Sequence, residues 1–528
     1  MSQGGWPPGG NHRRTTDDSM NLVELAEAKI RDSGEYVSIV FEGRDITNLE
    51  MERTSKRLAA ALRSLGVKRG DRVLVQMPNR PEVFQSFGAI WRIGAVVVPV
   101  NHMIGAEESA FIYRDCGAET LISSTDFLPR IEACRASTPA LRNVILAGGS
   151  VPKGYHSYHQ LADVNPEETS IADTGDDDLA AIVYTAGTTG RPKGAMHSHH
   201  SLHYSGRIFH EQVPAPEGTV SVFVLPMCHI YGITCMVTAF FHKRGKAIIL
   251  SAFTIDKIFE AIQTYRGNLF VGVPTLYVYM LLHPDPKKYD LSSMKWWISG
   301  SAALAPQTWH DFREKFGFDI IEGWGMTETG ATGCCNPHDQ PRKPGSIGKS
   351  SPRAQLRIVD NSGQEVPQGQ QGEIVIKTPG AMMGYWKRPE ETAEVLKDGW
   401  VSSGDIGYVD EDGFYFITDR KKDIIIKGGE NICPREIEEV IMTHPGVSEA
   451  AVVGVKDGVY GEEIKAFVVA KPGVQVTTEE LNDHCCAHLK RFKTPKDFTF
   501  MEALPKNLVG KVLRKDLRKI AQESQRVE

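Results

Sequence analysis

Residues 184–194 read YTAGTTGRPKG and directly follow an apolar run, LAAIV, at residues 179–183. The apolar run predicts a buried strand. The glycines after it let backbone N–H groups turn toward an anion, the threonines add hydroxyl donors, and Lys193 adds a positive charge. These groups suit a cradle for a polyphosphate. Flexible turns share this composition, but the length of the loop and its density of donors favour the phosphate interpretation.

Short apolar runs alternate with helical patterns on the N-terminal side of this loop. Helices are predicted over residues 51–65 and 81–93, and strands over residues 72–77 and 95–100. This alternation is typical of an α/β fold with mostly parallel sheets flanked by helices. We therefore expect residues 21–421 to form one large α/β domain.

The sequence changes character near residue 400. Residues 400–412 are rich in turn-forming residues, residues 413–418 read as a strand, and a charge cluster at residues 419–423 precedes three isoleucines. The rest predicts a small, mobile α+β domain over residues 422–528, with a hinge at the charge cluster. The alternative is an ordinary surface loop within one domain. Residues 1–20, rich in Gly and polar residues, are expected to be a disordered leader.

Composition excludes several classes of protein. The chain has 528 residues, 60 Lys+Arg and 66 Asp+Glu, with 41% hydrophobic residues, so it is neither disordered nor a basic nucleic-acid binder. Its nine cysteines include no C-x-x-C pair and suggest reduced thiols in the cytoplasm. Residues 219–241 carry no formal charge, but Pro226 and Gly232 interrupt them. We expect a buried strand, a turn and a buried helix there rather than a membrane span.

Three further motifs follow the loop in order. Residues 323–330 read GWGMTETG, in which Trp324 offers a flat face and Glu328 a ligand for Mg²⁺. Asp405, in the predicted turn Ser-Gly-Asp, is placed to accept hydrogen bonds from a diol. Lys511 ends the motif PKNLVGK. Each of these motifs is weak when it is taken alone.

Together, in this order, the four motifs resemble those of the adenylate-forming superfamily, which contains acyl-CoA synthetases, amino-acid adenylation domains and beetle luciferases. The resemblance covers roughly residues 45 to 520. It implies that ATP and AMP bind at a phosphate loop, an adenine site, a ribose-binding pair and a lysine of the C-terminal domain. The phosphate loop would contain Thr185, Ala186, Gly187, Thr188, Thr189, Gly190 and Lys193. The adenine site would contain Ser301, Ala302, Trp324, Gly325, Met326 and Thr327. The ribose-binding pair would be Asp405 and Arg420, and the lysine of the C-terminal domain would be Lys511.

The resemblance also implies the reaction. A carboxylate attacks the α-phosphate of ATP, pyrophosphate leaves, and the acyl-adenylate then passes its acyl group to the thiol of CoA. The implied catalytic residues are Lys511, Glu328, which would hold Mg²⁺, Thr185 and His229. A swivelling C-terminal domain, hinged at Lys422, would present Lys511 first and then the CoA-facing glycines, Gly428 and Gly429. Relatives of this kind are often dimers, so a homodimer stays open.

The acid itself is inferred from residue size. The resemblance places His229, Gly232, Gly300, Ser301 and Gly325 around the acyl group. Because most of them are small, we expect an open pocket and favour a medium- to long-chain fatty acid, with an aryl or alicyclic acid as the alternative.

Three other functions are compatible with some of these residues. An enzyme that loads a carrier protein stays open. A non-enzymatic nucleotide-binding regulator would have lost Lys511 or Glu328, and both are present. A metal site is suggested by four neighbouring histidines, but no nearby acidic or cysteine ligand completes it, so we interpret them as the start of a helix. These are His197, His199, His200 and His203.

Overall fold

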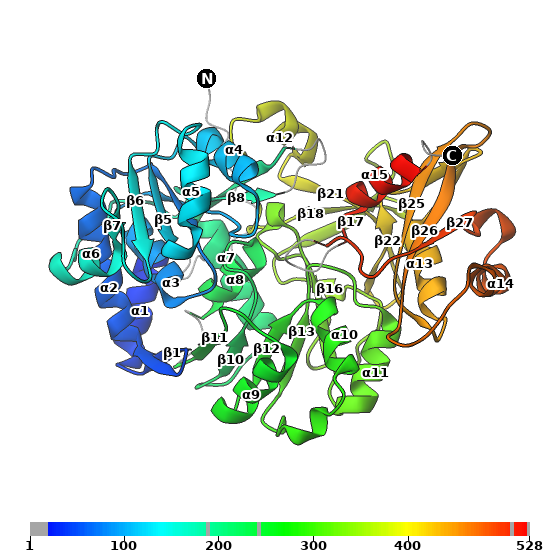
Figure 1. The fold of residues 1–528 in the computed structure, drawn as a ribbon, viewed down its shortest axis with the longest axis horizontal. Helices are drawn as coiled ribbons and strands as arrows, with labels where there is room; N and C mark the ends of the chain where they lie inside the picture. Colours follow the sequence, from blue (N-terminus) through cyan, green and yellow to red (C-terminus); the bar gives the residue numbers. More distant parts are fainter. Residues whose placement is uncertain (1–19, 186–190, 240–243, 507–511, 525–528) are drawn as a thin grey trace.

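The computed structural model describes residues 20–185, 191–239, 244–506 and 512–524 (Figure 1). The predicted leader, apart from Met20, and the predicted site residues Ala186–Gly190 and Lys511 lie outside these ranges. Within them the chain folds into two large sheets that share one core, a smaller antiparallel sheet, and a separate C-terminal domain.

The first large sheet is built mainly from the N-terminal third of the chain. Its strand order is β19-β9-β8-β4-β3-β5-β6-β7, and the pairs among β3 to β8 are parallel. The predicted strands at 72–77 and 95–100 and the helices at 51–65 and 81–93 are confirmed within a few residues. The elements are β3 (Arg72–Gln76), β4 (Val96–Pro99), β5 (Thr120–Ser124), β6 (Asn143–Ala147), β7 (His156–Ser157), β8 (Leu179–Thr185), β9 (Lys193–Ser198), β19 (Gly384–Tyr385), α2 (Asn48–Ser64), α3 (Pro81–Arg92), α4 (Ala106–Cys116), α5 (Leu128–Arg135) and α6 (Tyr158–Val164).

The second large sheet has the order β16-β15-β14-β13-β12-β10-β11-β1-β2 and is parallel from β14 to β1. One hydrophobic core contains residues of both large sheets, such as Val97 and Phe270, and of the helices α7 and α8. The elements are β1 (Val37–Phe41), β2 (Arg44–Thr47), β10 (Val220–Phe223), β11 (Lys246–Ile249), β12 (Leu269–Gly272), β13 (Trp296–Ser299), β14 (Ile320–Trp324), β15 (Cys334–Cys335), β16 (Lys349–Ser350), α1 (Leu22–Ser33), α7 (His199–Gln212), α8 (Ile230–Thr238), α9 (Ile255–Tyr265), α10 (Pro274–Leu282) and α11 (Pro306–Phe316).

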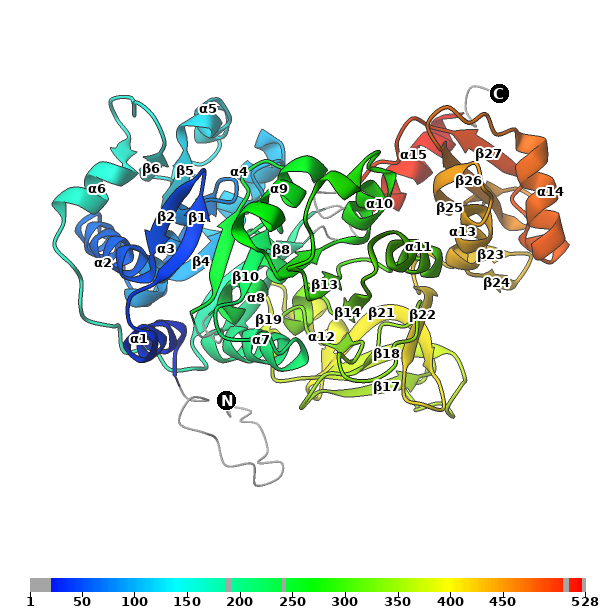
Figure 2. The ribbon, with the colours of Figure 1, turned by 90° about the horizontal axis from the view of Figure 1, so that it is seen from below.

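The third sheet was not foreseen, and it corrects one prediction. Residues 400–412 were expected to form turns, but most of them form the ten-residue strand β21, so Asp405 lies in a strand. Burial alternates along β21, and pairing with β18 and β22 outweighs the turn preference of its Ser and Gly residues. Figure 2 shows this sheet in yellow at the lower edge of the molecule. Its elements are β17 (Gln355–Val359), β18 (Gly372–Lys377), β20 (Leu396–Lys397), β21 (Trp400–Val409) and β22 (Tyr415–Arg420), with α12 (Pro389–Val395) before β20.

The C-terminal domain has its own five-stranded sheet and its own hydrophobic core, as predicted. The exact boundary at residue 421 and the mobility of the domain stay predictions. Helix α13 joins the domain to β22, where Arg435 donates from its backbone N–H to Asp419 and from Nη1 to the Ile417 carbonyl. The elements are β23 (Ile425–Lys427), β24 (Glu430–Ile432), α13 (Pro434–Met442), β25 (Val447–Asp457), β26 (Gly461–Ala470), α14 (Thr478–His488), β27 (Asp497–Phe500) and α15 (Arg514–Ser524).

Within the uncharged stretch, residues 220–238 form β10, a turn and α8, as expected. Helix α8 spans nine residues. None of the helices in the described ranges is long and apolar enough to cross a membrane.

Candidate active site

The phosphate-loop motif joins two antiparallel strands. Thr185 at the end of β8 pairs with Lys193 at the start of β9, so the strands bring both ends of the loop together. The ammonium of Lys193 lies 2.5 Å from a carboxylate oxygen of Glu391 and 5.4 Å from the ring centre of Tyr385. A half-buried positive charge is therefore held at the mouth of the loop by a neighbouring carboxylate.

Glu328 lies in a short 3₁₀ turn, Thr327–Thr329, after β14. Its Oε1 accepts a hydrogen bond of 2.6 Å from the hydroxyl of Tyr385, and its carbonyl accepts one from the Met382 backbone N–H. Among the described residues, no three His, Cys, Asp or Glu side chains are grouped to hold a metal. Mg²⁺ is usually bound by one or two carboxylates plus phosphates of the substrate. A single ordered carboxylate beside a phosphate loop therefore fits a magnesium ion that arrives with ATP.

His197 supports the same turn through its backbone. The residue is fully buried at the end of β9, and its Nε2 donates to the Thr327 carbonyl at 2.8 Å. Burial lowers the pKa of His197 to about 4, so the ring is neutral. This residue belongs to the histidine group that was considered for metal binding; it ends a strand rather than starting a helix. Its role as a support was missed because it depends on a contact between residues 130 positions apart.

Trp324, Asp405 and Arg420 form one connected cluster. Asp405 and Arg420 are direct partners in β21 and β22, and their side chains form an ion pair of 2.8 Å. The other oxygen of Asp405 accepts a hydrogen bond of 2.9 Å from the Trp324 indole. The sequence motifs at 323–330 and 403–405 thus meet in space, and the expected ribose-binding pair lies beside the expected adenine-side ring.

The loop after β13 lies against β14. Ser301 has a φ of 70°, a left-handed conformation that favours glycine. Glu322 is buried behind this loop and accepts a hydrogen bond from the Leu304 backbone N–H. Burial raises the pKa of Glu322 to about 7. No sequence motif singled out Glu322, since an acidic residue next to a glycine usually reads as a surface turn.

These elements are those of a known family. The sequence profile described as "AMP-binding enzyme" matches residues 26–386, and "AMP-binding enzyme C-terminal domain" matches residues 436–511. The chain belongs to the AMP-binding enzyme family. The family resemblance is thereby confirmed.

Several relatives of this AMP-binding enzyme are acid–CoA ligases, and one is a fatty acid–[acyl-carrier-protein] ligase, ScoC of Streptomyces coeruleorubidus, at 32% identity over 91% of this chain and 92% of the other. It is 34% identical to a long-chain-fatty-acid–CoA ligase of Bacillus subtilis, with 91% of each chain covered. It is 35% identical to a feruloyl-CoA synthase of an Amycolatopsis species, covering 90% of this chain and 94% of the other. The crystal structure of the anthranilate CoA ligase AuaEII with anthranoyl-AMP has a TM-score of 0.91 at 27% identity and covers 96% and 98% of the two chains. The enzyme class, an AMP-forming acid–thiol ligase, and the fold class are confirmed.

The glycines expected to leave the acyl pocket open have other reasons to be small. A Cβ on Gly325 would lie 2.3 Å from the Ala331 backbone, and one on Gly232 would lie 2.2 Å from the Pro226 carbonyl. A Cβ on Gly300 would lie 3.0 Å from the ring of Tyr231. Their size therefore says nothing about the acid, and their contact with the acyl group stays a prediction.

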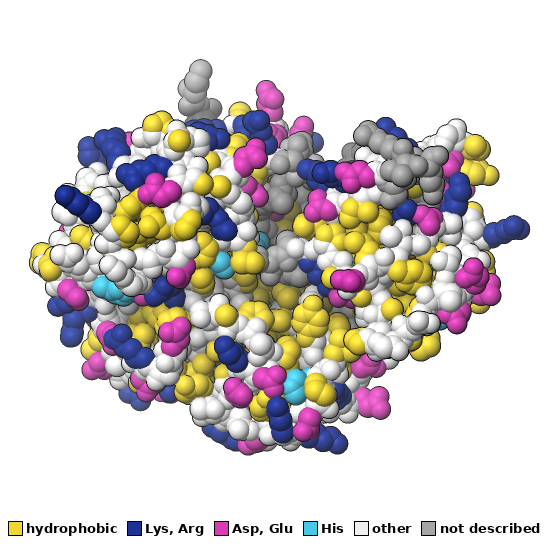
Figure 3. Space-filling model, in the orientation of Figure 1, with side chains coloured by type: hydrophobic (Ala, Val, Ile, Leu, Met, Phe, Trp, Pro, Cys, Tyr) yellow, Lys and Arg dark blue, Asp and Glu magenta, His cyan; other side chains and the backbone are white. Residues whose placement is uncertain are grey.

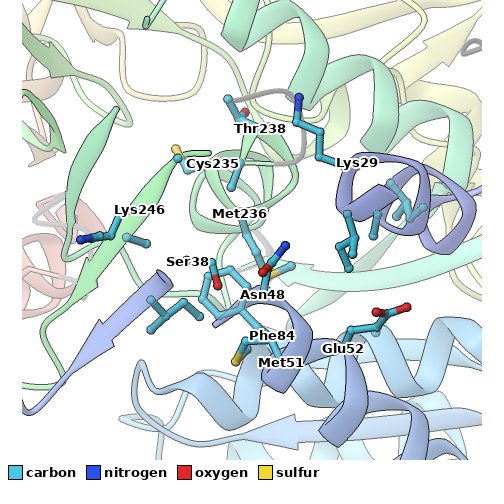
Figure 4. Close-up of a pocket in the computed structure, with 18 of the residues that line it drawn as sticks. Lys29, Ser38, Asn48, Met51, Glu52, Phe84, Cys235, Met236, Thr238 and Lys246 are labelled. Carbon is cyan, nitrogen blue, oxygen red and sulfur yellow. The ribbon is translucent and has the colours of Figure 1, made fainter. Parts of the chain in front are cut away.

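The AMP-binding enzyme has a cavity of about 200 Å³ beyond these residues (Figure 4). It lies among β10, β11 and β12 on one side and α1, α2, α3 and α8 on the other. Its wall is largely apolar, and Figure 4 shows Met51, Phe84, Cys235 and Met236 around it, with charged groups such as Lys29 and Glu52 toward its edges.

Tyr231 lies between this cavity and Gly300. Its ring covers Gly300 on one side and packs edge-on against Phe209, a wall residue of the cavity, at 6.2 Å on the other. His229 occupies the N-cap position of α8 without a side-chain capping hydrogen bond, and burial lowers the pKa of His229. Helix α8 therefore runs from His229 to the cavity wall.

The C-terminal residues can be placed in part. Lys422 is exposed in a turn after β22, and Gly428 and Gly429 have φ values of 58° and 88° between β23 and β24. Lys511 lies outside the described residues, but its flanks are held together by pairing of Lys506 with Val512. Hydrophobic side chains gather in the middle of the face shown in Figure 3, between the large body and this domain. The roles of the hinge, CoA and lysine positions stay predictions.

Proposed function

We propose that this enzyme activates an aliphatic carboxylic acid of medium or long chain with ATP and transfers it to CoA. The observation that supports the chain length is the apolar cavity along α8. A helix of nine residues is roughly 13 Å long. An acid with its carboxylate beside His229 and its tail along α8 would reach the wall residues Cys235 and Met236. Each buried methylene contributes about 0.8 kcal/mol, so such a cavity favours long tails.

The first step is nucleophilic attack by the acid on the α-phosphate of ATP. The charge that develops on the phosphate oxygens would be stabilised by Lys193, Lys511 and the backbone donors of the loop. Glu328 would hold the magnesium ion, which neutralises charge on the phosphates when it is bound. Asp405 would accept hydrogen bonds from the ribose, and Arg420 keeps that carboxylate in place through the 2.8 Å ion pair. Pyrophosphate leaves and acyl-AMP is formed.

The second step is attack by the CoA thiol on the acyl carbon, which releases AMP. Lys511 and the pair Gly428 and Gly429 would serve different steps from the same domain, so the domain would turn about Lys422 between them.

All nine cysteines are free thiols, which supports a reducing compartment such as the cytoplasm.

A series of straight-chain acids tests this function. The enzyme is given ATP, Mg²⁺ and acetate, hexanoate, octanoate, dodecanoate or palmitate, and AMP is measured with and without CoA. We expect CoA-dependent AMP release that rises steeply with chain length and levels off where the cavity is full. Acetate turning over as efficiently as octanoate would contradict the proposed acid, and AMP release without any need for CoA would contradict the proposed acceptor.

An aromatic acid is the second candidate. Tyr231 covers Gly300 with a flat ring, which would stack on an aryl group and shorten the pocket next to the adenylate. Benzoate, ferulate and cyclohexanecarboxylate belong in the same assay. Higher efficiency on an aryl acid than on every aliphatic acid would favour this candidate and leave the reaction itself unchanged.

A further inference from the structure

Tyr385 touches both charges that the polyphosphate would meet. Its hydroxyl donates to Glu328 Oε1 at 2.6 Å, and the ammonium of Lys193 lies 5.4 Å from its ring centre. The side chain is only 7% exposed. One buried aromatic residue thus connects the expected metal-binding carboxylate with the expected phosphate-binding lysine.

Backbone pairing fixes the position of Tyr385. The short strand β19 pairs antiparallel with β9, so that Tyr385 stands opposite Ala195. The Trp386 N–H donates to the Gly194 carbonyl at 2.7 Å, and the Met382 N–H donates to the Glu328 carbonyl at 2.8 Å. Segments far apart in the sequence are therefore held in register where Tyr385 reaches Glu328.

The hydrogen bond controls how the carboxylate is oriented. A donor on Oε1 fixes rotation about the last bond of the Glu328 side chain, so the position of Oε2 is fixed as well. The His197 bond to Thr327 holds the backbone of the same turn.

We propose that Tyr385 is a positioning residue that orients Glu328 for the magnesium ion of ATP. The proposal rests on the proposed function, because it takes Glu328 as the residue that meets ATP–Mg²⁺. A purely structural role is the competing explanation, since Tyr385 also packs in a small core with Ala195 and Met382. The two explanations differ in which atoms matter: packing needs the ring, whereas orientation needs the hydroxyl.

Tyr385→Phe removes the hydroxyl and keeps the ring. We expect a non-hydrolysable ATP analogue to bind five- to twentyfold more weakly in the presence of Mg²⁺, measured by titration calorimetry, and to bind equally well without Mg²⁺. The Mg²⁺ concentration that half-saturates adenylation should rise by a similar factor, with the KM of the acid unchanged. Tyr158→Phe is the matched control, because it removes a buried hydroxyl that donates to Gln85 away from this site.

A double-mutant cycle sharpens the test. In a Glu328→Gln background, Tyr385→Phe should have little further effect on Mg²⁺-dependent binding, because the oriented carboxylate is already gone. Unchanged Mg²⁺ dependence in Tyr385→Phe, or an equal loss in Tyr158→Phe, would overturn the proposal. The binding measurement needs neither acid nor CoA, so a failure of the proposed substrate or acceptor is seen separately.

Discussion

The proposed nucleotide side and the proposed acyl side of this enzyme are built in opposite ways. On the nucleotide side, single polar groups such as Lys193, Glu328 and Asp405 are each held by a specific partner. On the acyl side, a cavity is lined by apolar residues from many helices and strands, and none of them dominates.

The difference follows from the chemistry that each side would perform. Charge that develops on a phosphate must be stabilised by donors in fixed positions, so removing one donor lowers the rate of that step strongly. An alkyl tail is bound by burial, which depends on total apolar area and is spread over many side chains. Substitutions on the nucleotide side should therefore abolish a step, whereas those on the acyl side should shift a preference.

Lys511→Ala should have the largest effect. Removing one ammonium from the α-phosphate typically costs about 10² to 10³ in rate. We expect overall ligation to be lost while supplied acyl-adenylate is still converted to acyl-CoA, with each half-reaction followed by chromatography of the products. Lys506→Ala is the matched control, because Lys506 forms an ion pair with Glu449 at the base of the same segment. Equal loss of both half-reactions would refute the role of Lys511.

Lys422→Pro should separate the two steps in the opposite direction. Proline fixes φ at the predicted hinge and also restricts Lys421, whose N–H donates to the Gly404 carbonyl. Adenylation should survive and thioester formation should slow markedly in single-turnover assays. Lys422→Ala, which removes only the side chain, should behave like the parent. If both half-reactions of the proline variant keep their normal rates, the hinge lies elsewhere.

Part of the proposed nucleotide side could be located from the sequence because its residues lie in short polar motifs. Trp324, Asp405 and Arg420 lie together, as the resemblance implied, although the turn expected around Asp405 is a strand. Their roles toward ATP stay predictions. Supporting residues such as His197 were missed because their role depends on one long-range contact.

The acyl side could not be predicted in this way. Its wall residues, such as Phe84 and Met236, have the same apolar character as the rest of the core, and burial alone does not mark a cavity. Gly325 and Gly232, which suggested an open pocket, are small because neighbouring backbone crowds them, and Gly300 is covered by the ring of Tyr231. Residue size is thus a poor guide where the backbone already requires glycine.

Ala247→Phe tests the acyl side directly. Ala247 lies on β11 and lines the cavity, so a phenyl group there should fill space that the tail would occupy. Losing burial of two methylenes, about 1.6 kcal/mol, corresponds to a roughly fifteenfold lower kcat/KM for palmitate, with hexanoate little changed. Phe84→Leu, which enlarges the cavity, should move the preference toward longer acids. The same chain-length profile in the parent and in both variants would show that the tail binds elsewhere.

Glu391→Gln should improve ATP binding slightly, whereas the substitutions above impair a step or a substrate preference. The carboxylate pairs with Lys193 at 2.5 Å, and an ATP phosphate would have to displace it. Partly exposed ion pairs contribute about 0.5 to 1 kcal/mol, so the KM for ATP should fall about two- to fivefold. Glu390→Gln changes an exposed neighbouring charge and should leave that KM unaltered. A raised KM in Glu391→Gln would mean that Glu391 helps to bind ATP instead of competing with it.

Ser301→Gly should produce the smallest change, and it tests whether the loop between the two sides carries strain. Ser301 has a φ of 70°, a conformation that costs an L-residue about 1 to 2 kcal/mol. Glycine relieves this strain. The greater conformational entropy of glycine in the unfolded chain offsets about 0.5 to 1 kcal/mol of that gain. We therefore expect a net increase of about 0.5 to 1 kcal/mol in the free energy of unfolding, measured in urea without ligands. Ala303→Gly, at an exposed position in the same loop, should not stabilise the protein. If Ser301→Gly lowers stability, the serine side chain contributes more than its backbone conformation costs, and the loop has adapted to it.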